Sequence, residues 1–314
     1  MDNFKNAILN FNKQLSPSML RLSRLEKIKN SKPDSIIIVG MGGSGQAGFL
    51  ISDLKYELGI TAPVMVWENY DLPKINYKKP LFIFVSFSGN TAETLSGFSK
   101  AKLKAVVCSG GKLEQMADKS KSPIVVFSAG NLAPRQANGL MFSAIAQIIK
   151  AAFPKTKTNF SRVNPASLEK YGKQIAAKIK NKTILVYSSP ENNHLSYVWK
   201  TNLNETAKAM AFSGTFPEMV HNEIVPFENR QKNTVILFLK NWAGQAGKKA
   251  AVVAKLLKKS GISSLEIKLS GKNNIEKTLN SVILAHWTSY CLAKIKKIDP
   301  AETKLIRQIK KLTN

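Results

Sequence analysis

The stretch that decides the fold is Leu81-Phe82-Ile83-Phe84-Val85 followed by Ser86-Phe87-Ser88-Gly89-Asn90-Thr91. Its first five residues are a short apolar run, typical of a strand buried on both faces of a parallel sheet. The next six residues bring three hydroxyl groups and a glycine into one turn. Because hydroxyls and backbone N–H groups can converge on an anion in such a turn, the stretch predicts phosphate binding at the end of a strand. A plain helix N-cap is the alternative reading of the same residues.

The same strand–turn–helix pattern runs along the whole chain. Short apolar runs are found at 35–39, 64–67, 81–85, 105–108, 124–127, 183–187, 234–239 and 264–269. Helical stretches include 46–58, 92–100, 138–153, 197–210, 275–298 and 301–312. This alternation predicts α/β architecture with parallel sheets covered on both faces. The polar stretch 154–159 reads as a linker, so we expect two domains of similar design, 1–153 and 154–314.

Length and composition limit the class of protein. The chain has 314 residues and a formal net charge of +27, from 47 basic and 20 acidic residues. The basic residues are spread out and no nucleic-acid-binding motif accompanies them, so we expect the positive charge to attract an anionic metabolite rather than nucleic acid. We expect neither a membrane span nor a signal peptide. Cys108 and Cys291 are expected to be free, buried thiols of a cytoplasmic protein.

A glycine cluster comes directly after the run at 35–39. Gly40-Met41-Gly42-Gly43-Ser44-Gly45 matches the spacing of a dinucleotide-binding fingerprint. The acidic residue expected roughly 20 positions later is missing, since Glu68 comes too late. Two Gly/Ser turns at the carboxyl ends of parallel strands instead predict two sides of one sugar-phosphate pocket.

Several motifs carry a resemblance to a known family. They are Gly42-Gly43-Ser44-Gly45, Ser86-Phe87-Ser88-Gly89-Asn90-Thr91, Pro134-Arg135, Asn204-Glu205-Thr206-Ala207-Lys208 and Pro217-Glu218-Met219-Val220-His221-Asn222-Glu223. The set resembles the archaeal-type bifunctional phosphoglucose/phosphomannose isomerases over nearly the whole chain. The resemblance implies two sugar-isomerase (SIS) domains, each a doubly wound, flavodoxin-like three-layer α/β fold. It also implies an isomerase that interconverts glucose 6-phosphate and mannose 6-phosphate with fructose 6-phosphate through a cis-enediol, without metal or cofactor.

The resemblance assigns a role to each candidate residue. The residues that would bind phosphate are Ser44, Ser86, Ser88 and Thr91, together with backbone amides near Gly43. Arg135 would stabilise the negative charge of the enediolate, and Glu205 would transfer the proton. His221 and Lys310 would open the sugar ring. In the family, the histidine equivalent to His221 reaches the site of the partner subunit, which implies a homodimer.

Two candidates depend on the register of the C-terminal helix. The segment that begins Asp299-Pro300 matches the family's helix that bears the catalytic lysine, and the register of its apolar residues favours Lys310 over Lys304 or Lys311. In the same register Thr303 stands where ordinary glucose-phosphate isomerases carry a glutamine. Its smaller side chain would leave room for the enediol to rotate, so that either sugar configuration can form.

Residue chemistry alone leaves alternatives. Proton transfer between neighbouring carbons needs a carboxylate such as Glu205, but a surface glutamate paired with Lys208 fits the same helical spacing. His221 lies among Glu218, Asn222 and Glu223, a setting that could tune an imidazole. His194 reads as a loop or helix-start residue and His286 as a core residue. A non-catalytic SIS-domain sensor of sugar phosphates remains the alternative function. An amidotransferase-like sugar isomerase would need an N-terminal catalytic cysteine domain or a glutamine source, and we see neither.

Overall fold

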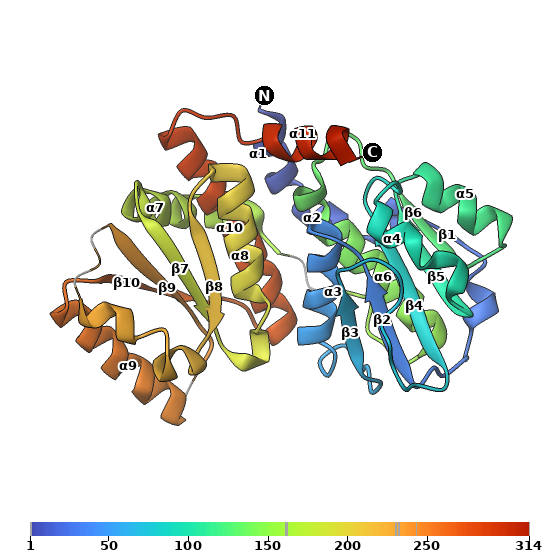
Figure 1. Cartoon of the computed structure of the whole chain (residues 1–314), viewed down its shortest axis with the longest axis horizontal. Helices are drawn as coiled ribbons and strands as arrows, with labels where there is room; N and C mark the ends of the chain where they lie inside the picture. The colour runs from blue at the N-terminus through green and yellow to red at the C-terminus, as the bar shows by residue number, and fades with distance from the viewer. Residues whose placement is uncertain (1, 161–162, 230, 232, 243, 314) are drawn as a thin grey trace. The chain divides into compact units, whose positions relative to one another are not determined.

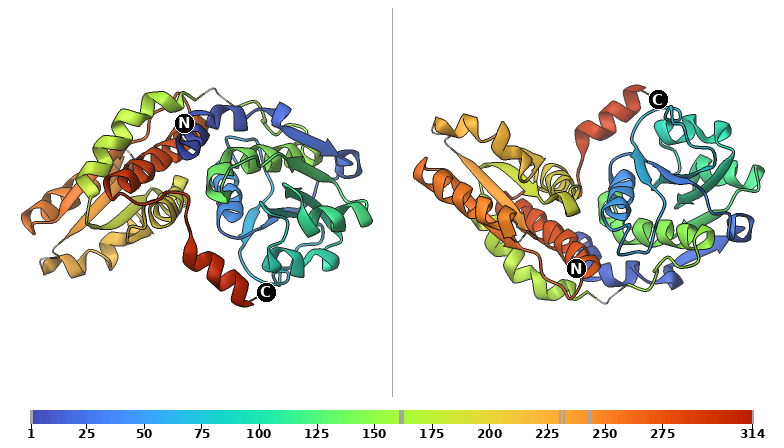
Figure 2. Two further views of the ribbon diagram at one scale, coloured as in Figure 1. Left: turned by 90° about the horizontal axis from the view of Figure 1, so that it is seen from above. Right: turned by 90° about the horizontal axis from the view of Figure 1, so that it is seen from below.

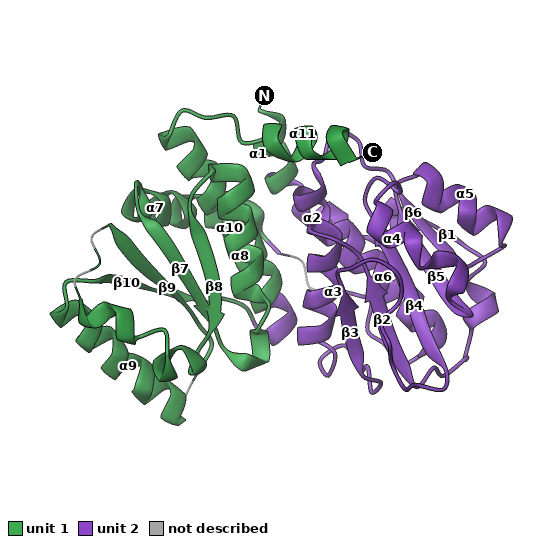
Figure 3. Cartoon of the chain, viewed as in Figure 1, with its two compact units in different colours: residues 1–8, 164–271, 277–314 green, residues 9–163, 272–276 purple. Residues whose placement is uncertain are grey.

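The computed structural model describes residues 2–160, 163–229, 231, 233–242 and 244–313. They form an α/β protein with two mostly parallel sheets, each covered by helices on both faces, as the sequence predicts (Figure 1). The chain divides into two compact units. Unit 1 comprises residues 1–8, 164–271 and 277–314, and unit 2 comprises residues 9–163 and 272–276 (Figure 3).

Unit 2 contains a six-stranded sheet with the order β1-β6-β5-β4-β2-β3. Its strands are β1 (Leu20–Ser23), β2 (Ser35–Val39), β3 (Val64–Trp67), β4 (Pro80–Ser86), β5 (Leu103–Cys108) and β6 (Ile124–Phe127). Its helices are α2 (Phe11–Gln14), α3 (Gly43–Asp53), α4 (Ala92–Ser96), α5 (Gly111–Lys119) and α6 (Asn138–Ala152). Every strand pair is parallel except β1 with β6.

The side chains of β2 show why helices cover both faces of this sheet. Ile37 packs in a core with Phe84 on β4 and Leu113 on α5. The next residue, Ile38, faces the other way. A Cβ built on Gly48 of α3 would lie 2.8 Å from its side chain, so helix and strand are in close contact. Because neighbouring residues of one strand are buried on opposite faces, the strand is apolar throughout.

Unit 1 contains a four-stranded parallel sheet with the order β10-β9-β7-β8. Its strands are β7 (Thr183–Ser188), β8 (Ala211–Thr215), β9 (Thr234–Lys240) and β10 (Ser263–Lys268). Its helices are α7 (Glu169–Ile179), α8 (Leu195–Ala207), α9 (Gly244–Lys259), α10 (Asn274–Ile295) and α11 (Lys304–Thr313), with most of α1 (Asn3–Leu9).

Helices α8 and α10 lie on one face of this sheet and α9 on the other (Figure 2). The indole Nε1 of Trp199 on α8 donates to Ser281 Oγ on α10 at 3.0 Å. On the opposite face, Val253 and Leu257 of α9 join the core that contains Phe238 of β9. Helix α11 comes after α10 and buries none of its residues.

The bounds of the units differ from the expected ranges 1–153 and 154–314. The amino-terminal residues belong to unit 1, where the Tyr290 hydroxyl donates to the Asp2 carboxylate at 2.7 Å and Lys5 pairs with Glu169 at 2.6 Å. The linker at 154–159 belongs to unit 2. Met1 and Asn314, the ends of the expected ranges, lie outside the described residues. The division into two domains at these positions stays a prediction.

Other expectations can be compared with the structure directly. The helix expected at 92–100 is wrong in part, because it breaks at Gly97 into α4 and a 3-10 turn. A Cβ on Gly97 would lie 2.9 Å from the carbonyl oxygen of Asp71, so the backbone leaves too little room there for a larger residue. Both cysteines are free as predicted, and burial raises the pKa of the Cys108 thiol to about 11. Cys291 is only partly buried.

No helix in the described part of the chain is long and apolar enough to cross a membrane.

Candidate functional site

The turn after β4 in unit 2 is built around the hydroxyl of Ser86. This side chain is 1% exposed, and its Oγ accepts the N–H of Gly89 at 3.0 Å and lies 2.9 Å from Thr91 Oγ1. Ser88 is exposed, and its Oγ accepts the N–H of Asn90 at 3.2 Å. The buried Ser86 hydroxyl therefore stabilises the turn through hydrogen bonds inside it, while Ser88 and the half-buried Thr91 lie closer to the surface.

A second turn, after β5, supports the first one. Gly89 has φ of +68°, and a Cβ placed on it would lie only 1.7 Å from the carbonyl oxygen of Gly110. The Ser109 hydroxyl donates to the Phe87 carbonyl at 2.5 Å, and the Asn90 side chain accepts the N–H of Lys112 at 3.1 Å. Position 89 therefore requires glycine, both for its backbone angle and for the space around it.

The first glycine cluster and Arg135 belong to the same region of unit 2. Ser44, in the first turn of α3, accepts the Phe87 N–H through its Oγ at 3.1 Å. A Cβ on Gly43 would lie 2.9 Å from the carbonyl carbon of Pro134, so the loop touches the segment that carries Arg135. Arg135 is 3% exposed and is the second residue of the 3-10 turn Pro134–Ala137, which leads into α6. Unit 2 thus brings together the predicted phosphate-binding residues and Arg135.

Glu205 lies in the last turn of α8 in unit 1 and is half-buried. The helix ends at Lys208, which has φ of +46°. The Nζ of Lys296 donates to the carbonyl oxygens of Ala207 and Lys208, each at 2.9 Å. The carbonyls at a helix end lack donors within the helix, so Lys296 fixes the end of α8 just after Glu205.

Glu205 and Thr303 line the same pocket of unit 1, which has a volume of about 390 Å³. Its other lining residues are Asn204, Lys208, Glu302, Lys304, Leu305 and Ile306. The lysine of α11 that reaches this pocket is Lys304. Lys310 lies further along the exposed helix and is not among the lining residues, and Lys311 lines a separate hollow with Lys304.

His221 follows the end of β8 opposite to the end that lies next to Glu205. Asn204, next to Glu205, donates to the carbonyl of Ala211, the first residue of β8, at 3.3 Å. His221 ends the short helix Glu218–His221, which comes after the last residue of β8. The five residues of β8 extend over about 17 Å, from the end that Asn204 contacts to the start of the segment that carries His221.

The acidic residues around His221 have other partners. The carboxylate of Glu218 accepts from Asn222 Nδ2 at 3.3 Å, and that of Glu223 accepts from the Tyr187 hydroxyl at 2.6 Å. Burial and the Glu223 carboxylate raise the pKa of Tyr187, so its hydroxyl stays a donor. His221 itself is exposed. As expected, His194 stands at the start of α8 and His286 is buried in α10.

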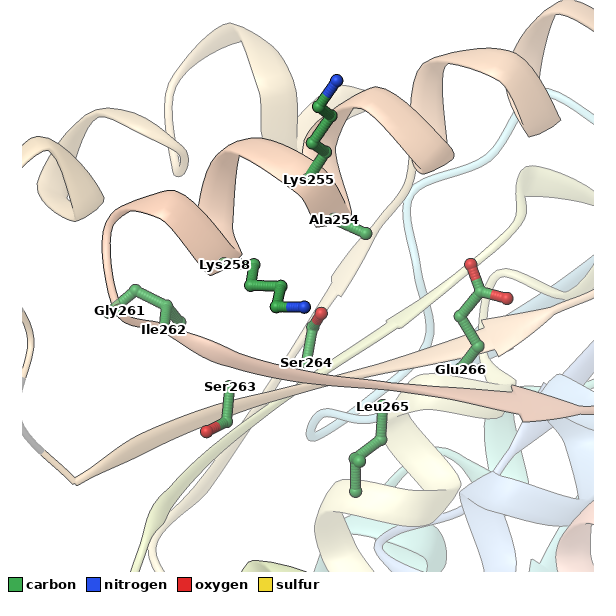
Figure 4. A pocket seen from close by; sticks show the side chains of 9 residues that line it. All are labelled: Ala254, Lys255, Lys258, Gly261, Ile262, Ser263, Ser264, Leu265 and Glu266. Carbon is green, nitrogen blue, oxygen red and sulfur yellow. The ribbon is translucent and has the colours of Figure 1, made fainter.

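A further hollow of unit 1 contains none of the predicted site residues. It lies between α9 and the edge strand β10 and is lined by Lys258, Ser264 and Glu266, among others (Figure 4). The Lys258 amine points toward the Ser264 hydroxyl, whereas Lys255 points away from it.

Sequence reasoning missed the contacts that surround Glu205. Lys296 stands among several lysines at the end of α10, and no spacing distinguishes it from its neighbours. The helical spacing suggests Lys208 as a pair for Glu205 and gives no sign that its Nζ also donates to the carbonyl of Asp299, at 2.7 Å. Its place at the end of a helix, before a turn, is the signal that could have indicated a backbone contact.

Comparisons with known proteins identify the fold and the family of this chain. Residues 168–312 match the family model of the bacterial phospho-glucose isomerase C-terminal SIS domain. The C-terminal domain of glucosamine-fructose-6-phosphate aminotransferase from Francisella tularensis superposes with a TM-score of 0.69 at 16% identity, covering 95% of this chain and 98% of that one. That likeness shows a shared fold, and the family model identifies the fold as that of SIS domains.

Two curated relatives match along most of their length. The bifunctional phosphoglucose/phosphomannose isomerase of Aquifex aeolicus is 30% identical over 286 residues, covering 88% of this chain and 89% of the relative. The enzyme of the same name from Thermoplasma volcanium is 30% identical over 312 residues, covering 95% and 99%. Identity at this level over nearly complete chains shows that this chain belongs to the bifunctional phosphoglucose/phosphomannose isomerase family.

Proposed function

We propose that this protein is an isomerase that interconverts glucose 6-phosphate and mannose 6-phosphate with fructose 6-phosphate. The observation that carries the proposal is the pocket of unit 1 that holds Glu205 together with Thr303. A carboxylate in a pocket can move a proton between neighbouring carbons, and a small side chain beside it leaves space for the intermediate. The names of the two relatives point to the same pair of aldose substrates.

Phosphate binding is the proposed role of the turn after β4 and of the loop that precedes α3. The hydroxyls of Ser88 and Thr91 supply donors near the surface, and Ser44 and Ser86 hold the backbone around them. Backbone amides near Gly43 complete the set. The high positive charge of the chain would favour the approach of an anionic sugar.

The proposed chemistry is a proton shuttle. Glu205 removes the proton from the carbon next to the carbonyl, which gives a cis-enediol, and returns it to the neighbouring carbon. Arg135, a fixed cation that is almost fully buried, would offset the negative charge that develops on the enediol oxygen. None of these steps requires a metal or a cofactor. We place the reaction in the cytoplasm, where both thiols would stay reduced.

Ring opening precedes the proton shuttle, and we assign it to His221 and a lysine of α11. The separation of His221 from Glu205 along β8 supports a homodimer in which His221 serves the partner's site. The exposure of His221 is consistent with such a role. Lys310 is the lysine that the family register favours, whereas the lining of the pocket favours Lys304.

Turnover of the three sugar phosphates by the purified protein tests the proposal. Glucose 6-phosphate and mannose 6-phosphate are each followed by the appearance of fructose 6-phosphate. The alternative function, a sensor that binds sugar phosphate without converting it, predicts binding with no product. Free glucose should be a very poor substrate, and equal rates on glucose and its 6-phosphate would exclude a phosphate-binding pocket.

Subunit mixing tests the homodimer. Glu205→Gln and His221→Ala should each be inactive, but exchange of their subunits creates one site with both intact residues. In a two-fold dimer up to about half of the sites in the mixed species could then work. No recovery after proven exchange would show that each site is completed within one chain.

A further inference from the structure

We infer that Lys208 and Lys296 are positioning residues that hold Thr303 beside Glu205. The inference rests on the proposed function, since it concerns the same pocket. It assigns no proton transfer to either lysine. Lys296 connects the end of α8 with the end of α10, and Lys208 connects it with the segment before α11, in both cases through hydrogen bonds to main-chain carbonyls.

Lys296 fixes the end of α8 that carries Glu205. Its Nζ lies 2.9 Å from the carbonyl oxygens of both Ala207 and Lys208. The amine is partly buried, and this burial lowers the pKa of Lys296. A cation at a helix C-terminus is also favoured by the helix dipole. Lys296 lies just beyond α10, so it joins the end of α8 to that long, buried helix.

Lys208 joins the same helix end to the segment before α11. Its Nζ donates to the carbonyl of Asp299 at 2.7 Å. The Asp299 carboxylate in turn accepts the N–H of Ala301 at 2.8 Å, which closes a small turn. Thr303 comes two residues later, and its carbonyl accepts the N–H of Arg307 in the first turn of α11. The position of Thr303 is therefore coupled to the end of α8.

Helix α11 has no buried face among its described residues. All its described residues are exposed, with Leu305 at 74% and Leu312 at 87%. A helix without a buried face gains little from packing. We therefore expect the hydrogen bonds of the Asp299 turn to be the main interactions that fix the position of Thr303. A shift of 1 Å in a side chain that shapes a reacting centre can lower the rate by up to about 100-fold.

Three lysine variants test this role. Lys208→Met and Lys296→Met remove the donors while keeping side chains of similar length. Lys297→Met is the matched control, because Lys297 is also exposed, has φ of +54° like the +46° of Lys208, and loses the same charge. We expect kcat on both aldose phosphates to fall about tenfold in Lys208→Met and Lys296→Met, with KM within about twofold of wild type. Lys297→Met should match wild type, and Lys208→Arg, which keeps a donor, should restore part of kcat.

A second measurement separates positioning from general stability and from the proposed function. Amide hydrogen exchange of residues 299–313 in the whole protein should be about tenfold faster in Lys208→Met than in Lys297→Met, while α10 stays protected as in wild type. Equal exchange in the two variants would overturn the inference, whether or not the protein is active. Faster exchange with unchanged kcat would overturn it too. A wild-type protein without turnover would refute the proposed function, and the exchange comparison would still decide whether the lysines anchor α11.

Discussion

The two units share a strand order over four strands but differ in the turns after the corresponding strands. The order β3-β2-β4-β5 in unit 2 matches β8-β7-β9-β10 in unit 1. After β4 comes the hydroxyl-rich turn that begins at Ser86. After β9, at the equivalent place, Trp242 packs on Phe216 with ring centroids 4.9 Å apart. One sheet thus presents hydrogen-bonding groups where the other presents an aromatic cluster.

The edges of the sheets differ as well. In unit 2, β6 and β1 extend the sheet beyond β5. In unit 1, β10 is the last described strand, and it carries exposed Glu266 and Lys268. Charged residues on an edge strand discourage pairing with another chain. The comparison teaches that a common sheet supports different local chemistry, so we propose that phosphate binding belongs to unit 2 and proton transfer to unit 1.

The largest effect is expected from unit 1. Glu205→Gln keeps the shape of the side chain but removes the base, so kcat should fall by about 100- to 10,000-fold while KM changes little. Glu302→Gln is the matched control, because Glu302 lines the same pocket but its carboxylate bonds to Arg307. The coupled assay with glucose 6-phosphate measures both. If Glu205→Gln kept more than a tenth of the wild-type rate, Glu205 would not be the base.

The second-largest effect on kcat is expected from a lysine of α11. Replacing the acid that opens the sugar ring should lower kcat by roughly 100-fold, at the lower limit for such a group. Lys310→Met, Lys304→Met and Lys311→Met would be compared under the same conditions. If the register taken from the family resemblance is right, kcat should fall in Lys310→Met. If the lysine that lines the pocket is the acid, kcat should fall in Lys304→Met. Equal activity in all three variants would mean that α11 supplies no acid.

Apolar periodicity predicted the buried strands well, because strands such as β2 are apolar on both faces. It missed β8, whose sequence Ala-Phe-Ser-Gly-Thr contains small and partly exposed residues and no apolar run. It also missed β1, a four-residue strand with two exposed positions. Strands at sheet edges need less burial, so their sequences carry a weaker signal.

The candidate site was predictable only in part, for a similar physical reason. The turn at 86–91 has a local signature, since its hydroxyls and glycine bond within the turn itself. The contact between Lys208 and Asp299 joins residues far apart in sequence, and lysines are common throughout the chain. The pocket shared by Glu205 and Thr303 was expected from a family resemblance, which supplied a pairing that no spacing could reveal.

A smaller effect in unit 1 concerns the choice between sugars. Thr303→Gln places a longer amide beside Glu205, where it would fill the space in which the enediol rotates. Conversion of mannose 6-phosphate should fall about tenfold more than that of glucose 6-phosphate, a difference of about 1.4 kcal/mol in the barriers. Each activity is followed separately with fructose 6-phosphate as product. Thr303→Ser, which keeps a small side chain, should retain the wild-type ratio. A parallel loss of both activities would argue against a role for Thr303 in selectivity.

The smallest effect compares equivalent turns of the two units. Ser88→Ala and Thr91→Ala each remove one hydroxyl from the turn after β4, so KM for glucose 6-phosphate should rise about fivefold per substitution, as expected for a hydrogen bond of about 1 kcal/mol. Turnover at saturation should change less, because the phosphate does not react. Ser86→Ala should act differently: it removes the acceptor of the Gly89 N–H from inside the turn and should lower stability as well. Asn241→Ala is the control from the turn after β9, where the side chain accepts from Lys277 at 3.4 Å. If KM rose as much in Asn241→Ala as in Ser88→Ala, phosphate binding would not be confined to unit 2, and the contrast between the two turns would lose its functional meaning.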